Sequence, residues 1–228
     1  MNTPPIRRAA IFGASGGVGA AIAGAVEARG AEVLRFARSG HLPFDLTDEV
    51  SIAAAAERAG EVDFVFVATG MLHAPGIAPE KSFAAIAPEA LAASFALNAI
   101  GPALIAKHML PRLPRKGRAV FAALSARVGS IEDNRLGGWH GYRASKAALN
   151  MLIRGFAIEL SRRNREALAV ALHPGTVATA LSKPFQASAP KGLFTPEESA
   201  ARLLSVLEGL GPEATGGFYA HDGAAIPF

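Results

Sequence analysis

Tyr142 and Lys146 are the residues whose types and spacing are best suited to chemistry. Residues four apart on a helix lie on the same face, and 142–146 opens a helical stretch, so an ammonium group should lie beside a phenol. A free tyrosine has a pKa of about 10, and a neighbouring cation favours the phenolate and lowers that pKa. The pair predicts proton transfer at neutral pH, although the same spacing is common on exposed helices.

A glycine-rich turn follows the first apolar run of the chain. Gly13, Gly17 and Gly19 lie between the apolar run 9–12 and a helical stretch over 18–29. Backbone amides at a helix N-terminus can bind a pyrophosphate when no Cβ atom intervenes. The spacing differs from the usual dinucleotide pattern Gly-x-Gly-x-x-Gly. The order of strand, turn and helix nevertheless favours a dinucleotide-binding turn over an ordinary tight turn.

The end of the second apolar run indicates which dinucleotide would bind. Dinucleotide folds carry an acidic residue about 20 positions after the glycine turn, where it accepts a hydrogen bond from the adenosine ribose. Counting from Gly17 reaches Ala37, and Arg38 and Ser39 follow. A guanidinium pairs with a 2′-phosphate rather than with a free hydroxyl. The sequence therefore predicts NADP(H) rather than NAD(H).

Apolar runs separated by helical stretches must position these residues. Strands buried on both faces of a parallel sheet read as continuous apolar runs, and the intervening stretches are long enough for crossover helices. We expect one α/β domain over 1–228, with a Rossmann-type, doubly wound, mostly parallel sheet of about seven strands in a three-layer α/β/α arrangement. The strands are predicted at 9–12, 32–37, 62–68, 118–124, 167–173 and 217–220.

Alanine-rich segments with helical periodicity make up most of the chain between the apolar runs. The segment 182–195 has neither period, and we expect a loop or lid that contacts the substrate. Trp139 and Phe185 are candidates to enclose a hydrophobic substrate. The helices are predicted at 18–29, 50–59, 88–110, 142–162 and 196–207.

The composition limits the class of protein. The 228 residues are 50% hydrophobic and 18% charged, with a net charge of +4, six histidines and no cysteine. Without cysteine there are no disulfides or thiolate ligands, and no two histidines have metal-ligand spacing, so we predict no metal site. The basic residues are scattered, which argues against nucleic-acid binding. No stretch approaches the ~20 apolar residues of a membrane span and no signal sequence is evident, so we expect a cytoplasmic protein that binds no membrane.

Four motifs in series resemble those of the short-chain dehydrogenase/reductase family. They are the glycine turn, Asn-Ala-Ile-Gly at 98–101, Tyr-Arg-Ala-Ser-Lys at 142–146 and His-Pro-Gly-Thr-Val-Ala-Thr at 173–179. Their order and spacing match the family, and the resemblance covers nearly the whole chain. The stretch 129–150 is further similar to the C-factor and sniffer-like carbonyl reductase subgroup.

The resemblance implies a catalytic tetrad and a nucleotide site. Tyr142 would exchange the substrate proton, Lys146 would lower the pKa of Tyr142 and hold the nicotinamide ribose, and Asn98 would keep a water that links Lys146 to solvent. Ser125 would hydrogen-bond the substrate oxygen. The implied reaction is an NADP(H)-dependent interconversion of a carbonyl compound and an alcohol by hydride transfer. The residues expected at the cofactor are Gly13, Ser15, Gly16, Gly17, Val18, Gly19, Arg38, Ser39, Asp45, Leu46, Ala68, Thr69, Gly70, Asn98, Tyr142, Lys146, Pro174, Gly175, Val177 and Thr179.

Two places depart from the family pattern. The family's Asn-Asn-Ala-Gly stretch is Val-Ala-Thr-Gly at 67–70, which removes side-chain hydrogen bonds but keeps backbone contacts to the cofactor possible. Ser125 lies 17 positions before Tyr142, a longer gap than is usual, and Ser130, at 12 positions, is the alternative catalytic serine. We favour Ser125 because it follows the strand predicted at 118–124, at the edge where open α/β sheets bind ligands.

A second function and a mode of assembly are also open. An NADP-binding signalling or sensor protein with little or no turnover is the alternative, because the C-factor subgroup has been tied to intercellular signalling. The intact Tyr142, Lys146 and Asn98 argue against it, since binding alone needs no proton donor. Broad apolar faces on the helices predicted at 88–110 and 142–162 indicate a homodimer or homotetramer. The expected partner is a small carbonyl or alcohol substrate.

Overall fold

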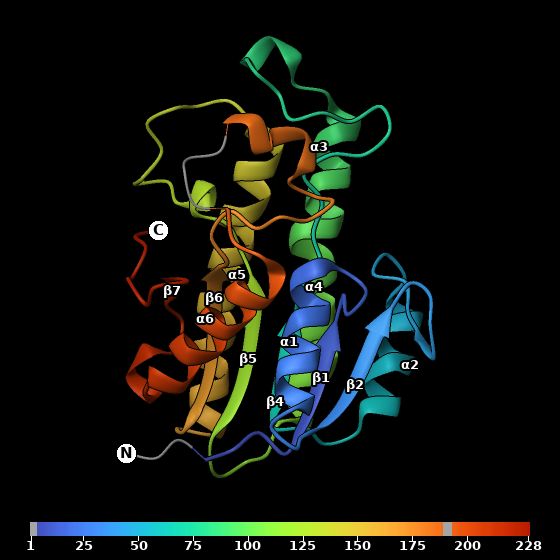
Figure 1. Ribbon diagram of the computed structural model, residues 1–228, viewed down its shortest axis with the longest axis vertical. Helices are drawn as coiled ribbons and strands as arrows, with labels where there is room; N and C mark the ends of the chain where they lie inside the picture. Colours follow the sequence, from blue (N-terminus) through green and yellow to red (C-terminus); the bar gives the residue numbers. More distant parts are fainter. Residues whose placement is uncertain (1–3, 189–192) are drawn as a thin grey trace.

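The computed structural model describes residues 4–188 and 193–228, and these form one sheet with helices on both faces (Figure 1). The strand order is β3-β2-β1-β4-β5-β6-β7, and every neighbouring pair is parallel. The doubly wound Rossmann-type fold is confirmed, with a sheet that is parallel throughout. The strands are β1 (Arg8–Phe12), β2 (Glu32–Ala37), β3 (Leu42–Pro43), β4 (Phe64–Val67), β5 (Ala119–Leu124), β6 (Ala167–His173) and β7 (Phe218–Ala220).

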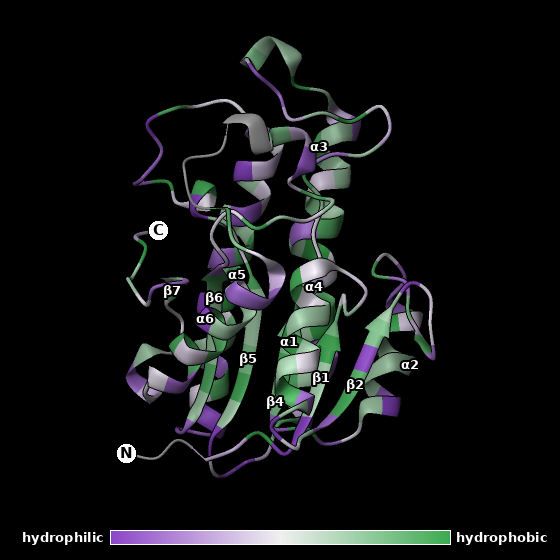
Figure 2. Ribbon diagram, in the orientation of Figure 1, coloured by the Kyte–Doolittle hydropathy of each residue, from purple (hydrophilic) through white to green (hydrophobic). Residues whose placement is uncertain are grey.

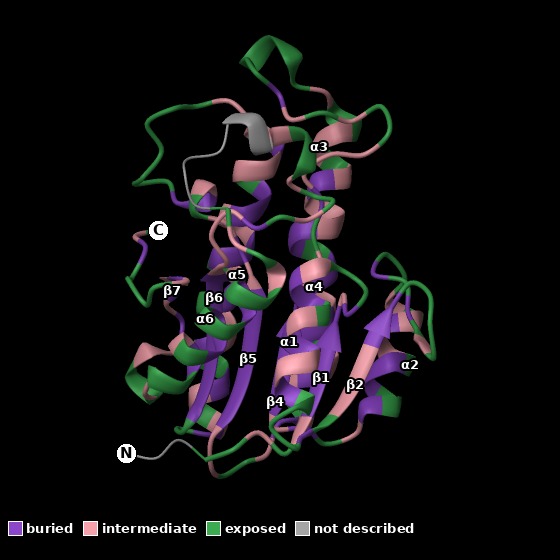
Figure 3. Cartoon of the chain, in the orientation of Figure 1, coloured by how far each residue is buried: buried purple, intermediate pink, exposed green. Residues whose placement is uncertain are grey.

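Two apolar clusters lie on opposite faces of the sheet and hold the three layers together. One cluster joins the sheet to α2, α4 and α5, and the other joins it to α1 and α6. The central strands β1, β4, β5 and β6 are apolar and buried along most of their length, as Figures 2 and 3 show. The three-layer arrangement is therefore confirmed. The helices are α1 (Gly17–Glu27), α2 (Glu49–Ala59), α3 (Pro88–Phe95), α4 (Gly101–Met109), α5 (His140–Arg163) and α6 (Pro196–Gly209).

The helix predicted at 88–110 is a continuous helical run with a break in its period. A π-helical turn, Ala96–Ile100, connects α3 to α4. Such turns insert one residue into the helical period and frequently occur at functional sites. Here the turn carries Asn98, which is completely buried.

The same run meets the length and composition of a membrane span, contrary to the sequence expectation. Pro88–Arg112 contains a window of mean hydropathy 1.4, of which 39% is buried. A core helix of a globular domain passes this test equally well. Ile105, Ala106 and Met109 are fully buried against the sheet, which accounts for the apolar character of the run.

The segment 182–195 leads into the last helix. It includes a 3-10 helix, Lys183–Ser188, and residues 189–192 of the predicted loop lie outside the described residues. Thr195 begins α6 with a capping box, in which its hydroxyl accepts from the Glu198 amide and the Glu198 carboxylate accepts from the Thr195 amide. This reciprocal cap explains why α6 starts at Pro196, as predicted.

Candidate active site

The predicted site residues follow the carboxyl ends of the central strands. The glycine turn follows β1, residues 68–70 follow β4, Ser125 follows β5, and residues 174–179 follow β6. Parallel strands bring these segments to one edge of the sheet, where open α/β folds bind ligands. The sequence-distant motifs therefore converge on one region.

Tyr142 and Lys146 occupy the first turns of α5 and face the end of β5. Lys146 Nζ lies 5.9 Å from the centroid of the Tyr142 ring and donates to the Leu124 carbonyl at 2.8 Å. Burial raises the pKa of Tyr142 to about 12 and lowers the pKa of Lys146 to about 8. The sequence predicted a lowered pKa for Tyr142; in this structure the pKa is raised instead, because desolvation of the phenol dominates. At neutral pH, Tyr142 is a protonated donor beside an ammonium group.

Asn98 ties the loop after β4 to α5. Its Oδ1 accepts from the Met71 amide at 2.7 Å, and its Nδ2 donates to the Met71 carbonyl at 2.8 Å. Nδ2 also donates to Ser145 Oγ at 3.0 Å, and Ser145 Oγ donates to the Tyr142 carbonyl at 2.9 Å. The Asn98 side-chain amide, carried by the π-helical turn, therefore points inward and holds the first turn of α5 in place.

Ser125 and Ser130 are both buried but have different partners. Ser125 Oγ donates to Asn150 Oδ1 at 2.7 Å, and its amide donates to the Leu172 carbonyl at 2.8 Å. Ser130 Oγ accepts from the Asp133 amide at 3.0 Å and so stabilises a turn of the loop before α5. Ser125 directly follows Leu124, whose carbonyl binds Lys146.

The glycine turn packs too closely for side chains. A Cβ on Gly13, whose φ is +87°, would lie 2.9 Å from the Ala68 carbonyl carbon, and one on Gly19 would lie 2.3 Å from the Gly13 oxygen. A Cβ on Gly17 would lie 2.8 Å from the Thr179 methyl carbon, so the turn also meets the segment after β6. These contacts explain the unusual spacing of the three glycines.

The first turn of α1 is free to bind an anion. The amides of Gly17, Val18 and Gly19 make no hydrogen bond to another described residue. The helix has no side-chain cap and no acidic residue in its first turn. Unpaired amides at the positive end of a helix dipole favour a phosphate group.

Arg38, Ser39 and Asp45 lie on the exposed rim next to this turn. Arg38 and Ser39 follow β2, and neither makes a hydrogen bond or ion pair with a described side chain. Asp45 Oδ1 accepts from the Thr47 amide at 2.8 Å and from its hydroxyl at 2.7 Å. These bonds, assisted by the charge of Arg38, lower the pKa of Asp45. The Arg38 guanidinium therefore lies near the ionised Asp45 carboxylate at this rim without a hydrogen bond to a described side chain.

The remaining predicted cofactor residues occupy two environments. A Cβ on Gly70 would lie 3.3 Å from Asn98 Oδ1 and 3.4 Å from Lys146 Nζ, so the loop after β4 reaches both of these side chains. The neighbouring Thr69 Oγ1 is buried without a partner among the described residues. Leu46 and Val177, in contrast, are buried in the packed interior. Their side chains pack in the apolar clusters and are not exposed to a ligand.

Glu80 and Asn150 belong to the site but were missed by the sequence reasoning. The buried Glu80 carboxylate accepts from the Gly141 amide at 3.2 Å and so caps α5 from a distant loop. Its carbonyl accepts from Trp139, the one non-glycine residue with a positive φ, +49°, in the described chain. No local pattern reveals Glu80. Asn150 follows Lys146 by four residues, and this helical spacing could have indicated it.

Aromatic rings border Tyr142. The Trp139 and Tyr142 ring centroids are 6.3 Å apart in an edge-on arrangement, and Phe185 lies 5.3 Å from Trp139 and 5.8 Å from His73. His73 Nε2 is buried without a partner among the described residues. The segment containing Phe185 therefore packs beside the predicted proton donor.

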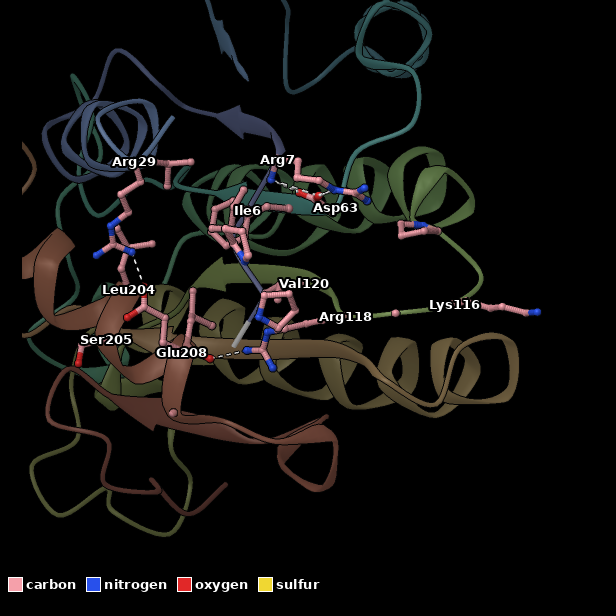
Figure 4. Close-up of a pocket in the computed structure, with 18 residues that line it drawn as sticks. Ile6, Arg7, Arg29, Asp63, Lys116, Arg118, Val120, Leu204, Ser205 and Glu208 are labelled. Atoms are coloured by element: carbon pink, nitrogen blue, oxygen red, sulfur yellow. Dashed lines mark hydrogen bonds and ion pairs between the residues drawn. The ribbon is translucent and has the colours of Figure 1, made fainter. Parts of the chain in front are cut away.

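A cavity at the opposite edge of the sheet is separate from this site. It has a volume of about 820 Å³, and the amino ends of β4 and β5 and the carboxyl ends of α1 and α6 border it (Figure 4). Two ion pairs lie in its lining, Arg7 with Asp63 and Arg29 with Glu208. Arg118 donates to the Leu207 and Leu210 carbonyls at the end of α6. The Arg118 bonds satisfy backbone carbonyls at the end of α6. None of the predicted site residues lines this cavity.

His173 makes the fold sensitive to acid. Burial, assisted by Arg127 and His221, lowers the pKa of His173 to about 4. The unfolded chain takes up this proton near pH 6.5, so the free energy of unfolding is retained above pH 6.5 and falls as the pH falls toward 4. We expect urea denaturation to show up to about 2 kcal/mol less stability at pH 5 than at pH 7.5. His173→Gln should reduce this difference, and His41→Gln, at an exposed site, should not; an unchanged difference in the first variant would contradict this assignment.

The parallel sheet, the glycine turn and the Tyr–Lys pair define the class of Rossmann-type oxidoreductases. Residues 7–189 match the family described as short chain dehydrogenase. The chain belongs to the short-chain dehydrogenase/reductase family, as its motifs indicated.

Relatives and a solved structure place the chain within this family. It is 36% identical over 138 residues to "C-signal" of Myxococcus xanthus, covering 60% of this chain and 78% of the relative. It is 33% identical over 186 residues to 1-hydroxy-2-glutathionyl-2-methyl-3-butene dehydrogenase of Rhodococcus sp. (strain AD45), covering 80% and 77%. An NADPH-bound carbonyl reductase from chicken fatty liver superposes with a TM-score of 0.85 at 23% identity, covering 100% and 96%. The expected likeness to C-signal is confirmed by the 36% identity, and the likeness to the carbonyl reductase is one of fold.

Proposed function

We propose that the protein is an NADP(H)-dependent oxidoreductase that interconverts a carbonyl compound and an alcohol, with Tyr142 as general acid and base. One observation carries this proposal: a protonated, partly buried phenol lies beside the Lys146 ammonium at the carboxyl edge of the sheet. A proton donor held in this way has a use in catalysis but none in binding alone. The whole chain, 1–228, would act as a single domain, with 182–195 as the substrate loop.

In the reducing direction, Tyr142 gives its proton to the carbonyl oxygen of the substrate. Ser125 donates a hydrogen bond to the same oxygen, so both donors stabilise the alkoxide as it develops. The Lys146 ammonium stabilises the phenolate that remains. In the oxidising direction, the same groups return the proton. The bound cofactor supplies or accepts the hydride.

The rim and turn residues fit NADP(H). The free amides at the start of α1 suit the pyrophosphate, and Arg38 with Ser39 suits the adenosine 2′-phosphate. Asp45 would accept from the adenine amino group, Lys146 would hold the nicotinamide ribose, and the backbone near Val177 would hold the carboxamide. The NADPH bound to the chicken carbonyl reductase, which shares the fold, supports this choice.

Arg38→Ala should weaken NADPH binding about 10- to 100-fold and leave NADH binding unchanged. A charge-assisted hydrogen bond contributes about 1.5–3 kcal/mol, and NADH lacks the phosphate that would accept it. Titration of each cofactor against the purified variant measures the effect. The matched control is Arg35→Ala on β2, whose guanidinium pairs with Glu27 at 2.7 Å. An equal loss of both cofactors in Arg38→Ala would contradict the assignment.

A signalling or sensor protein that binds NADP(H) with little or no turnover is the second candidate. The 36% identity to C-signal of Myxococcus xanthus favours it. The two candidates are separated by measuring NADPH and NADH oxidation with a panel of aldehydes, ketones and quinones. NADPH-selective turnover supports the reductase. Tight NADPH binding without turnover of any panel member supports the sensor.

We also propose a homodimer or homotetramer that works in the cytoplasm on a small carbonyl or alcohol substrate. The apolar side chains of Ile100, at the end of the π-helical turn, and of Met151 and Ile158 on α5 are exposed by 54%, 72% and 47%. Exposed apolar side chains on neighbouring helices favour association. Light scattering of the purified protein would establish the number of subunits.

A further inference from the structure

The partner of Ser125 is a side chain to which no role has been given. Asn150 is 2% exposed and lies on α5, eight residues after Tyr142 and four after Lys146. Residues at this spacing share one face of a helix. One helix face therefore carries the proton donor, the ammonium group and the partner of the serine.

The hydrogen bond between the two side chains conflicts with the role proposed for Ser125. Ser125 Oγ donates to Asn150 Oδ1 at 2.7 Å, while Asn150 Nδ2 is buried without a partner among the described residues. A hydroxyl has one proton, so a serine that donates to Asn150 cannot donate to a substrate oxygen. The observed orientation also leaves a buried N–H₂ group unpaired, which is costly.

Rotating the terminal amide by half a turn resolves both problems. Nδ2 then faces Ser125 Oγ and donates to it, and the amide oxygen takes the buried position without a partner, which costs less for a carbonyl than for an N–H. The two orientations have the same shape, so the packing is unchanged. The Ser125 hydroxyl is then free to donate its hydrogen bond to the substrate oxygen. The Ser125 backbone stays fixed by the Leu172 carbonyl, so only the hydroxyl changes direction.

We propose that Asn150 is a positioning residue whose amide sets the direction of the Ser125 hydroxyl proton. The inference rests on the proposed carbonyl reductase function and adds a residue to it. With the amide nitrogen toward Ser125, the serine is a donor to the substrate oxygen; with the amide oxygen toward Ser125, it is not.

Asn150→Asp tests this assignment because it changes the hydrogen-bonding group and keeps the shape. A carboxylate can only accept, so it holds the Ser125 proton permanently. We expect turnover of NADPH with an aldehyde or ketone of the panel to fall about 100-fold at pH 8, with KM for NADPH unchanged. Burial raises the pKa of such a carboxyl group, and its protonated form can donate to Ser125. The rate of the variant relative to wild type should therefore rise as the pH is lowered from 8 to 6.

A double-mutant cycle separates positioning from a general structural role. Once Ser125 is alanine, Asn150→Asp should lower turnover by no more than about twofold, because the two changes remove the same interaction. If Asn150→Asp does not fold, Asn150→Ala gives the same cycle. The matched control is Asn164→Asp, since Asn164 is a buried asparagine at the end of the same helix and donates to the Pro114 and Gly117 carbonyls. It should lower stability and leave the pH profile of turnover unchanged.

The outcomes distinguish this inference from the function on which it rests. If the wild-type protein shows turnover but the losses in the cycle are additive, the positioning role alone is overturned. The same holds if the pH profile of Asn150→Asp matches that of wild type. A wild-type protein without turnover overturns the reductase function and the positioning role together. Non-additive losses with a shifted pH profile support both.

Discussion

Tyr142→Phe should lower the turnover of carbonyl reduction by about 10²- to 10⁴-fold, the range for the loss of a general acid. Phenylalanine keeps the ring, so the edge-on contact with Trp139 can persist. Only the hydroxyl is lost. Because burial raises the pKa of Tyr142 to about 12, that hydroxyl carries its proton throughout the neutral range. The steady-state kcat with NADPH and a panel substrate measures the loss, while NADPH binding should remain close to wild type.

The chain supplies a matched control for this variant. It contains two tyrosines, and the other, Tyr219, lies on β7 and donates to the Ala214 carbonyl at 3.1 Å. Tyr219→Phe removes one hydrogen bond, worth about 1 kcal/mol of stability, and should keep full turnover. Unchanged turnover in Tyr142→Phe, or an equal loss in both variants, would rule out Tyr142 as the proton donor.

The parts of the fold that the sequence predicts are those with a local signature. Buried parallel strands are continuous apolar runs, so β2 and β6 were predicted at their observed bounds. Tyr142 and Lys146 share a helix face because of a spacing of four residues. The edge strand β3 has two residues, Leu42–Pro43, and pairs only with the end of β2. A strand of that length has no periodicity to detect.

The parts that the sequence does not predict depend on contacts between distant segments. Glu80 caps α5 across 61 positions, and the turn at Asn98 becomes π-helical where its amide binds the Met71 backbone. The direction of the Tyr142 pKa shift also depends on contacts between distant segments. Spacing identifies Lys146 as a neighbouring cation, but the extent of desolvation is set by everything packed around the phenol. A local pattern therefore identified the pair and gave the wrong sign for its pKa shift.

The choice between Ser125 and Ser130 as the proposed catalytic serine depends on which strand end faces the substrate. Ser125 directly follows β5, and its neighbour Leu124 accepts from Lys146 Nζ, so the backbone of this segment is fixed beside Lys146. Ser130 lies beyond the 3-10 helix Arg127–Gly129, and its hydroxyl is used within the loop. The longer gap between Ser125 and Tyr142 is taken up by that loop.

Ser125→Ala should therefore lower turnover by about 10²- to 10³-fold, the loss expected when one donor to a developing oxyanion is removed. Ser130→Ala is the matched control, because it removes an equally buried hydroxyl that accepts from the Asp133 amide. It should cost about 1 kcal/mol in the free energy of unfolding and leave kcat near wild type. Measuring kcat and urea stability for both variants separates the two effects. Full turnover in Ser125→Ala with a loss in Ser130→Ala would transfer the role to Ser130, and full turnover in both would mean that neither serine binds the substrate oxygen.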